Sequence, residues 1–292
     1  MAKETAASRA FHPPAAANSA QHANVLTVLL KNKRPLVMGV LNVTPDSFSD
    51  GGKFIDPAQA IEHARRLAAE GADIIDIGAE STRPYGGAEP VSADEELGRL
   101  RPILAEVAAL GIPVSIDSMK SAVVAWALEA GAVIANDVWG LQRDPDIAPL
   151  LAAHRSPVIV MHNRDRVDPG IDIMQDIAAY FGRSLEIAAK AGISAGNIVL
   201  DPGIGFGKTP EQSMTALARL HELEGFGLPL LVGASRKRFI ASVTPSEPNQ
   251  RLGGSIAAHL IAAKAGARII RTHDVSETVQ ALRVASAIWD KR

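Results

Sequence analysis

Several polar residues that could do chemistry stand at intervals along this chain of 292 residues, each just after a short apolar run. Asp117, Asn136 and Asp201 form one chemical group, because their carboxylate and amide oxygens accept hydrogen bonds. A carboxylate accepts two parallel N–H bonds, which suits the guanidine-like edge of a flat heterocycle such as an aminopyrimidinone ring.

A second group of residues is cationic. Lys237, Arg271 and His273 follow the last two apolar runs, and Arg83 lies in a loop after the second run. Such side chains suit an anion, above all phosphate or diphosphate. The two groups together predict a ligand in which a heterocycle carries a phosphate group.

A glycine-rich segment, DPGIGFGKT at 201–209, looks like a nucleotide-binding P-loop but has the wrong spacing. A P-loop needs glycine five residues before its Gly-Lys pair, and Pro202 stands at that position. We therefore expect these glycines to let the backbone turn sharply after a strand. Phe206 would then either stack on a flat ring or simply pack under the loop, and the sequence favours neither.

Apolar runs and amphipathic stretches alternate from residue 34 onward, and they define the elements that must position these side chains. The strand-like runs are 36–41, 73–77, 113–116, 133–135, 158–161, 198–200, 230–232 and 268–270. The helix-like stretches are 57–70, 94–110, 121–130, 147–153, 173–191, 210–220, 252–265 and 276–289.

Eight strands that alternate with eight helices must pair in parallel through crossovers. Either a closed barrel or an open doubly wound sheet has this order, but eight even units in this length favour an α/β fold of the (β/α)8 TIM-barrel type. No G-x-G-x-x-G follows the first strand, which disfavours the nucleotide-binding open sheet. We therefore expect one barrel domain over 34–292.

The carboxyl ends of all barrel strands meet at one mouth, where function gathers. A single Asn or Asp at a strand end is as often a cap or turn former as a site residue. Here polar residues follow all eight strands, which predicts one site at that mouth. The loops 42–52 and 81–87 open onto it, either as lids or as plain exposed connectors.

Composition limits the classes of partner. The net charge of −2 gives no bulk attraction to nucleic acid or to a membrane surface. No apolar run reaches the roughly 18 residues of a membrane span. The absence of cysteine excludes disulfides and thiolate metal sites and fits a cytoplasmic location.

Residues 1–33 are expected to form a disordered or extended N-terminal tail. The first 23 residues are rich in Ala, Ser and Pro and lack the apolar block of a secretory signal. A transit peptide is the alternative interpretation of this segment.

Seven stretches, spread over essentially all of the chain after residue 33, resemble the dihydropteroate synthase family. They are GVLNVTPDSFSDGG at 39–52, ESTRP at 80–84, SIDS at 115–118, ANDVWG at 135–140, LDPGIGFGKT at 200–209, GASRKRFI at 233–240 and IRTHDV at 270–275. The first stretch and the one at 200–209 are the most specific.

The resemblance implies a folate-synthesis enzyme that joins (7,8-dihydropterin-6-yl)methyl diphosphate to 4-aminobenzoate and releases diphosphate. It implies that the pterin is bound by Asp117, Asn136, Met161, Asp201 and Lys237, and the diphosphate by Asn42, Arg83, Arg271 and His273. The aminobenzoate pocket would comprise Thr82, Arg83, Pro84, Phe206, Ser235 and Lys237, with Phe48 as part of a lid. The catalytic residues would be Asp117, Lys237, Arg271 and His273.

The resemblance further implies a magnesium ion (Mg2+) near Asn42, a homodimer formed through helices on one side of the barrel, and sulfonamides as mimics of aminobenzoate. The reaction would be dissociative and SN1-like, because a dihydropterin ring can stabilise a cation once diphosphate departs. Arg271 and His273 would stabilise the leaving group, and Asp117 would stabilise the developing cation.

Two alternative functions remain open. A pterin-dependent methyltransferase shares the barrel and the pterin slot but does not need the cationic set. A non-catalytic pterin-binding paralogue would be favoured by losses at the diphosphate site, yet every expected group is present. The sequence departs from the commonest family pattern at Ala79, Tyr85, 163–165 and Arg238, and none of these departures removes a proposed catalytic group.

Overall fold

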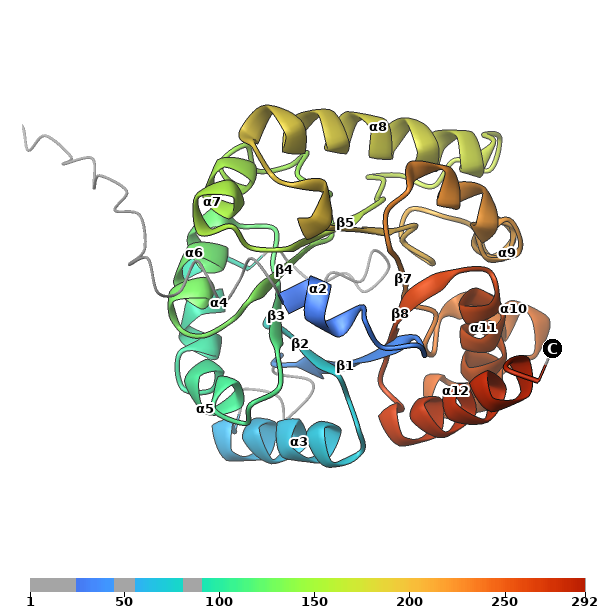
Figure 1. The fold of residues 1–292 in the computed structure, drawn as a ribbon, viewed down its shortest axis with the longest axis horizontal. Helices are drawn as coiled ribbons and strands as arrows, with labels where there is room; N and C mark the ends of the chain where they lie inside the picture. The colour runs from blue at the N-terminus through green and yellow to red at the C-terminus, as the bar shows by residue number, and fades with distance from the viewer. Residues whose placement is uncertain (1–24, 45–55, 81–90, 292) are drawn as a thin grey trace, which may run out of the picture.

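Eight parallel strands close into a barrel in the computed structural model, which describes residues 25–44, 56–80 and 91–291 (Figure 1). Each strand pairs with its neighbour in the chain, and β1 (Leu36–Asn42) closes the ring by pairing with β8 (Ala267–Thr272). The predicted (β/α)8 TIM barrel is therefore confirmed.

The remaining strands are β2 (Ile74–Gly78), β3 (Val114–Asp117), β4 (Ile134–Asp137), β5 (Val158–Met161), β6 (Ile198–Asp201) and β7 (Leu230–Val232). Every strand lies within two residues of the apolar run that predicted it. Asn42, Asp117 and Asp201 are the last residues of their strands, so they stand at the C-terminal end of the barrel.

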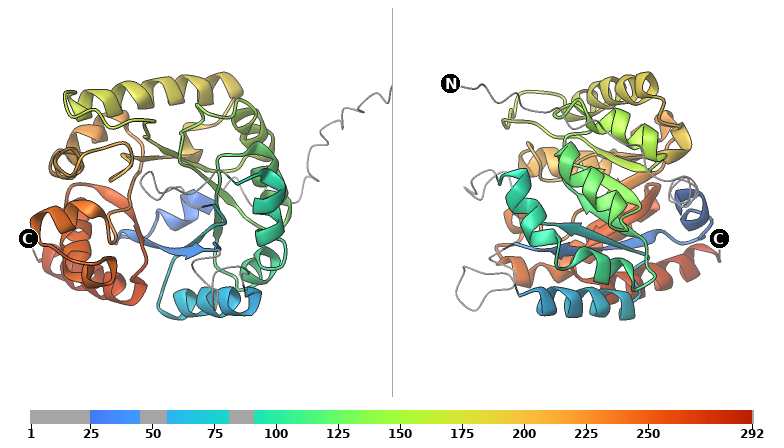
Figure 2. Two further views of the ribbon diagram at one scale, coloured as in Figure 1. Left: turned by 180° about the vertical axis from the view of Figure 1, so that it is seen from behind. Right: turned by 90° about the vertical axis from the view of Figure 1, so that its left-hand side faces the viewer.

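Helices surround the barrel and cover its outer surface (Figures 1 and 2). They are α3 (Pro57–Ala69), α4 (Ala93–Leu100), α5 (Leu104–Ala108), α6 (Ser121–Glu129), α7 (Ile147–His154), α8 (Ile173–Ala191), α9 (Pro210–Ala218), α10 (Arg238–Val243), α11 (Leu252–Lys264) and α12 (Val275–Trp289). Short 3₁₀ helices lie at η1 (Ala195–Asn197), η2 (Leu220–Phe226) and η3 (Pro248–Gln250). Within the described ranges, no helix has the length and apolarity that crossing a membrane requires.

Local sequence explains where these helices begin and end. The Asp172 side chain accepts a hydrogen bond from the Met174 amide at the start of α8, and Gly192 ends this helix in the left-handed conformation with φ 86°. At the start of α9, Thr209 and Gln212 form a capping box.

The stretch 94–110, predicted as one helix, forms the two helices α4 and α5. Pro102 lies between them, and a proline has no amide proton and clashes with the carbonyl four residues earlier. The helix α10 was not predicted at all, because its six residues are too few to show a helical period.

Strand side chains divide into an outer and an inner layer, because successive residues point to opposite faces. In β6, Leu200 belongs to the large apolar core that includes helix residues, whereas Val199 belongs to a small separate cluster. That inner cluster, within the barrel, comprises Leu26, Leu36, Met38, Ile74, Ile134, Ile159, Val199, Leu231 and Ile269.

The short helix α2 (Val25–Leu29) crosses one end of the barrel (Figure 1). Its Leu26 is 1% exposed and completes the inner cluster, whose strand residues lie toward the strands' N-terminal ends. The prediction of a disordered or extended tail over 1–33 is therefore wrong for the residues of α2. A helix of five residues with one buried leucine is too short to show a helical pattern in the sequence. Residues 1–24 lie outside the described part of the chain. We keep the single barrel domain as a proposal and add α2 to it.

Candidate active site

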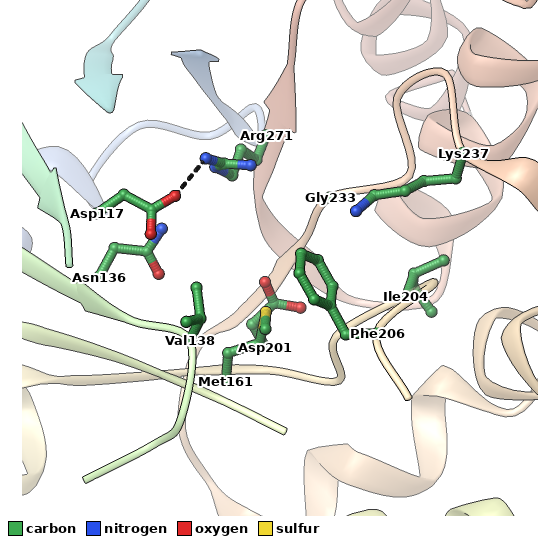
Figure 3. Close-up of a pocket in the computed structure, with 10 residues that line it drawn as sticks. All are labelled: Asp117, Asn136, Val138, Met161, Asp201, Ile204, Phe206, Gly233, Lys237 and Arg271. Atoms are coloured by element: carbon green, nitrogen blue, oxygen red, sulfur yellow. Dashed lines mark hydrogen bonds and ion pairs between the residues drawn. The ribbon is translucent and has the colours of Figure 1, made fainter. Parts of the chain in front are cut away.

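The inward-facing side chains change from apolar to polar toward the C-terminal end of the barrel. In β4, Ile134 belongs to the inner apolar cluster and Asn136 follows two residues later. In β8, Ile269 is followed in the same way by Arg271. Because residues two apart in a strand point to the same face, this alternation carries both polar side chains to the mouth (Figure 3).

A small cavity lies at this mouth (Figure 3). Charged, amide and apolar residues line it: Asp117, Asn136, Val138, Met161, Asp201, Ile204, Phe206, Gly233, Lys237 and Arg271. All the predicted pterin-binding residues are thus together in one place. The predicted residues Asn42, Ser235 and His273 do not line this cavity, and Phe48, Thr82, Arg83 and Pro84 lie outside the described residues.

Arg271 is held between two carboxylates inside the barrel. Its Nε donates to Asp76 Oδ2 at 2.6 Å, and its Nη2 donates to Asp117 Oδ2 at 2.8 Å. Asp76 Oδ2 also accepts a hydrogen bond from Asn136 Nδ2 at 3.1 Å. The sequence predicted separate acceptor and cationic sides, but the structure joins the two sides at this guanidinium group.

Asp76 is the residue that the sequence analysis missed. It is completely buried in the middle of β2, before the strand end. The sequence did contain a sign of its role, which is an aspartate within an otherwise apolar strand. A carboxylate at such a position is rarely buried unless it has a charged partner. A search confined to strand ends passes over such a position.

Four buried oxygen atoms near the mouth have no hydrogen-bond partner in the described part of the chain. They are Asp76 Oδ1, Ser115 Oγ, Asp117 Oδ1 and Asn136 Oδ1. Buried polar atoms in proteins are normally satisfied. Asp117 and Asn136 line the cavity from the neighbouring strands β3 and β4, so their two free oxygens match a ligand with N–H groups along one edge.

Burial also sets the protonation of the carboxyl groups. Burial raises the pKa of Asp117 to about 7, although Arg271 beside it acts in the opposite direction. Burial raises the pKa of Asp201 to about 6, against the effects of the Gly203 amide and Lys237. Ligand N–H groups that donate to these carboxylates would favour their ionised forms.

An apolar cluster of Val138, Met161 and Phe206 lies beside these polar groups. The Lys237 Nζ lies 4.0 Å from the centroid of the Phe206 ring, where a cation is attracted to the ring face. Phe206 is mostly buried yet lines the cavity, so it packs under Lys237 and can also contact a flat ligand ring (Figure 3).

His273 contacts Ser235 beyond the cavity lining. Its backbone N–H donates to Ser235 Oγ at 3.2 Å, and its Nδ1 lies 3.0 Å from the same oxygen. Burial, and next the charge of Arg271, lowers the pKa of His273 to about 3. The sequence predicted a cation at His273, whereas this low pKa favours a neutral ring. The neutral ring would meet an anion as a hydrogen-bond donor.

Asn42 ends β1 with a partly buried side chain. Its amide oxygen is a hard ligand of the kind that magnesium accepts. No group of three or more His, Cys, Asp or Glu side chains that could hold a metal ion exists among the described residues. Asn42 thus fits a magnesium ion that takes most of its ligands from phosphate and water.

Lys208 excludes the P-loop interpretation of the segment 201–209. Its side chain is buried, and its Nζ donates to the carbonyl oxygens of Gly203 at 2.9 Å and Phe206 at 3.1 Å. The lysine of a P-loop must instead reach a phosphate group.

Comparison with known proteins agrees with this arrangement. A family model described as "Pterin binding enzyme" matches residues 38–273. The dihydropteroate synthase of Bacillus subtilis (strain 168) is 42% identical over 266 residues, which cover 91% of this chain and 92% of that protein.

Two solved structures are similar over almost the same region. Dihydropteroate synthase from Clostridium difficile, in the presence of pteroic acid, has a TM-score of 0.84 and 45% identity and covers 88% of this chain and 97% of its own. The Xanthomonas albilineans enzyme with 4-aminobenzoic acid has a TM-score of 0.84 and 43% identity, with coverage of 88% and 94%. This chain belongs to the dihydropteroate synthase family of pterin-binding enzymes.

Proposed function

We propose that this protein is a dihydropteroate synthase, which joins (7,8-dihydropterin-6-yl)methyl diphosphate to 4-aminobenzoate and releases diphosphate in folate synthesis. The observation that carries this proposal is the pair of buried, unpartnered oxygens of Asp117 and Asn136 in a cavity that Lys237 and Arg271 also line. Family membership supports the same activity.

The pterin ring would lie in the barrel mouth with its amino-pyrimidinone edge toward Asp117, Asn136 and Asp201. These residues provide the acceptors that its N–H groups need. Lys237 would donate to the ring carbonyl side, and Met161 would pack on the ring face.

The diphosphate would lie above Arg271, where His273 and Asn42 can reach it. Arg271 would contribute fixed positive charge, and neutral His273 would contribute an Nε2–H donor. Ser235 Oγ accepts the His273 amide proton, so its own proton can go to Nδ1, which leaves the Nε2–H free to donate. Magnesium would arrive with the substrate, with Asn42 as one ligand, and would neutralise leaving-group charge.

The aminobenzoate ring would lie beside Phe206, with Ser235 and Lys237 near it. The X. albilineans relative with 4-aminobenzoic acid supports this substrate. Thr82, Arg83, Pro84 and the lid residue Phe48 stay predictions for the same pocket, as does sulfonamide binding there.

The reaction would begin as the bond between the pterin methylene carbon and the diphosphate oxygen breaks, with the electron pair leaving on oxygen. Asp117 would stabilise the cation on the ring, because its carboxylate lies in a buried site where charge acts strongly. The aniline nitrogen would then attack the methylene carbon and lose a proton. No covalent enzyme intermediate is required.

The two alternative functions predict different outcomes in one experiment. The purified protein is incubated with both substrates and magnesium, and dihydropteroate and diphosphate are measured. We expect both products in equal amounts. Pterin binding without products would support a non-catalytic protein, and methyl transfer from methyl-tetrahydrofolate to a corrinoid would support a methyltransferase. Arg271→Ala is the control for a contaminating enzyme, since it should lose activity and diphosphate affinity.

We also propose a homodimer through one side of the barrel, and a cytoplasmic location. Exposed apolar side chains gather on α10, α11 and α12, which contact one another or neighbouring helices (Figure 1). They are Val243, Leu252, Ile261, Val284 and Ile288. Large exposed apolar patches mark protein contact surfaces.

A further inference from the structure

A buried lysine lies beside the proposed site and donates to the backbone of the turn that carries Phe206. Lys208 is 2% exposed, and its Nζ donates to Gly203 O and Phe206 O. The same Nζ lies 2.6 Å from His162 Nδ1. Burial lowers the pKa of Lys208 to about 7, and the three protons of its ammonium form match these three acceptors.

His162 extends these contacts away from the cavity. Its Nε2 lies 2.9 Å from Asp176 Oδ2, and Asp176 also accepts from Arg164 at 2.8 Å. Burial lowers the pKa of His162 to about 4, so the ring is neutral. A neutral ring that accepts from Lys208 at Nδ1 must carry its proton on Nε2, where it donates to Asp176. The chain of contacts thus has one consistent direction.

The turn that Lys208 holds lies against another backbone segment. Gly203 has φ 64°, and a Cβ at this position would come within 2.0 Å of His162 O. Gly207 has φ 55°, and its Cβ would come within 2.5 Å of the Arg164 Cβ. Two glycines therefore let the backbone of 203–207 approach that of 162–164 so closely, and Lys208 connects the two segments.

The same turn positions two side chains of the proposed site. Gly203 N donates to Asp201 Oδ1 at 2.8 Å, and Phe206 N donates to Gly203 O at 3.0 Å. The Phe206 ring in turn lies under Lys237 (Figure 3). A shift of the turn would therefore move an acceptor of the pterin site and a wall of the aminobenzoate site together.

We propose that Lys208 is a positioning residue that holds the turn 203–206 against 162–164 and so presents Asp201 and Phe206 to the two substrates at once. The inference rests on the proposed function, because it assigns those two side chains to the two substrates. Lys208 itself does not line the cavity and is no substrate ligand.

The test compares Lys208→Met with Lys190→Met, which makes the same change at an exposed lysine of α8. Methionine fills the space but removes the donor to Phe206 O and His162 Nδ1 and leaves Gly203 O with only the Phe206 amide. We expect KM for both substrates to rise about tenfold or more and kcat to fall, because small misplacements of positioned groups are costly. Lys190→Met should behave as the wild type.

The KM values distinguish a positioning role of Lys208 from a role in stability alone. A variant that is only destabilised has fewer active molecules but unchanged KM values. If Lys208→Met folds and both KM values stay within about twofold of wild type, the positioning role is wrong.

A second measurement needs no variant and no activity. Nitrogen-15 NMR of the wild-type protein should show neutral His162 with its proton on Nε2 at pH 7. A proton on Nδ1 would mean that Lys208 does not donate there, and the proposal would be overturned. If the wild type makes no dihydropteroate, the proposed function fails, yet this NMR result and pterin affinity in Lys208→Met still decide whether the turn is held as described.

Discussion

At the scale of single residues, Arg271 connects the two parts of the proposed chemistry. Its guanidinium contacts Asp76 and Asp117, and Asp76 also holds Asn136. The cation that would stabilise departing diphosphate therefore also orients the acceptors for the pterin. Fixed groups of this kind lose little energy to reorganisation during the reaction.

Asp117→Asn tests the role of this carboxylate in stabilising a cation. Asparagine keeps the shape and one acceptor oxygen but removes the negative charge. We expect kcat to fall about a hundredfold or more, and pterin affinity to fall less than about tenfold. Steady-state kinetics and calorimetry with a dihydropterin lacking the diphosphate measure the two effects. Equal losses in both would contradict a role in the transition state.

Asp201→Asn tests the cost of burying a carboxylate for ligand binding. The folded-state pKa of Asp201, about 6, lies above the ordinary value of 3.8. Folding thus favours the neutral carboxyl, and this contribution, complete below pH 3.8, is lost as pH rises through 6. At pH 8 the variant should be more stable than wild type, by up to about 3 kcal/mol from a shift of roughly two units.

Urea unfolding of both proteins between pH 4 and 8 measures this difference. The gain should shrink as pH falls toward 4, while pterin affinity of the variant stays low. A stability difference that does not change with pH would show that Asp201 is not the group responsible.

At the scale of elements, the strand ends were predictable because two local patterns fix them. Apolar runs of three to seven residues mark the buried strands, and the period of two decides which side chains point inward. This was enough to predict that Asp117, Asn136 and Asp201 share a mouth. It did not predict that Arg271 pairs with Asp76, because side-chain partners across a barrel depend on packing between strands distant in sequence.

Other features were not predicted correctly, each for a different reason. Pro102 divides a helix-like stretch whose apolar pattern continues on both sides of it. The helix α2 depends on the packing of Leu26 against the interior of the barrel. The rest of the chain forms that interior, so the sequence of α2 alone does not predict it. Lys208 looks like part of a nucleotide-binding motif until the spacing of its glycines is checked.

Leu26→Ala tests whether α2 stabilises the barrel from the end opposite the site. Removing a buried leucine side chain should cost about 2–5 kcal/mol in the free energy of unfolding. Val28→Ala is the matched control, because Val28 is 62% exposed on the same helix. We expect unchanged KM values in both variants at a temperature where they are folded. Full stability of Leu26→Ala would contradict the packing of α2.

At the scale of the whole molecule, three regions of the barrel have different proposed roles. The N-terminal end is closed by α2, the C-terminal end carries the cavity, and one flank exposes apolar side chains on α10, α11 and α12. The proposed dimer would form through that flank.

Ile261→Glu tests the proposed homodimer. Ile261 is 54% exposed on α11, so a charge there should be harmless in a monomer but would be buried in the proposed dimer contact. Sedimentation analysis should give twice the chain mass for wild type and a shift toward the single-chain mass for the variant. Val28→Glu, on an exposed residue away from the flank, should leave the mass unchanged. A monomeric wild type would refute the dimer.

The most direct measurement of the central claim is a crystal structure with the pterin diphosphate and magnesium bound. We predict ring N–H groups within hydrogen-bond distance of Asp117, Asn136 and Asp201, and phosphate oxygens at Arg271 and His273. A pterin ring without hydrogen bonds to Asp117, Asn136 and Asp201, or a diphosphate without contact to Arg271, would contradict the proposed site.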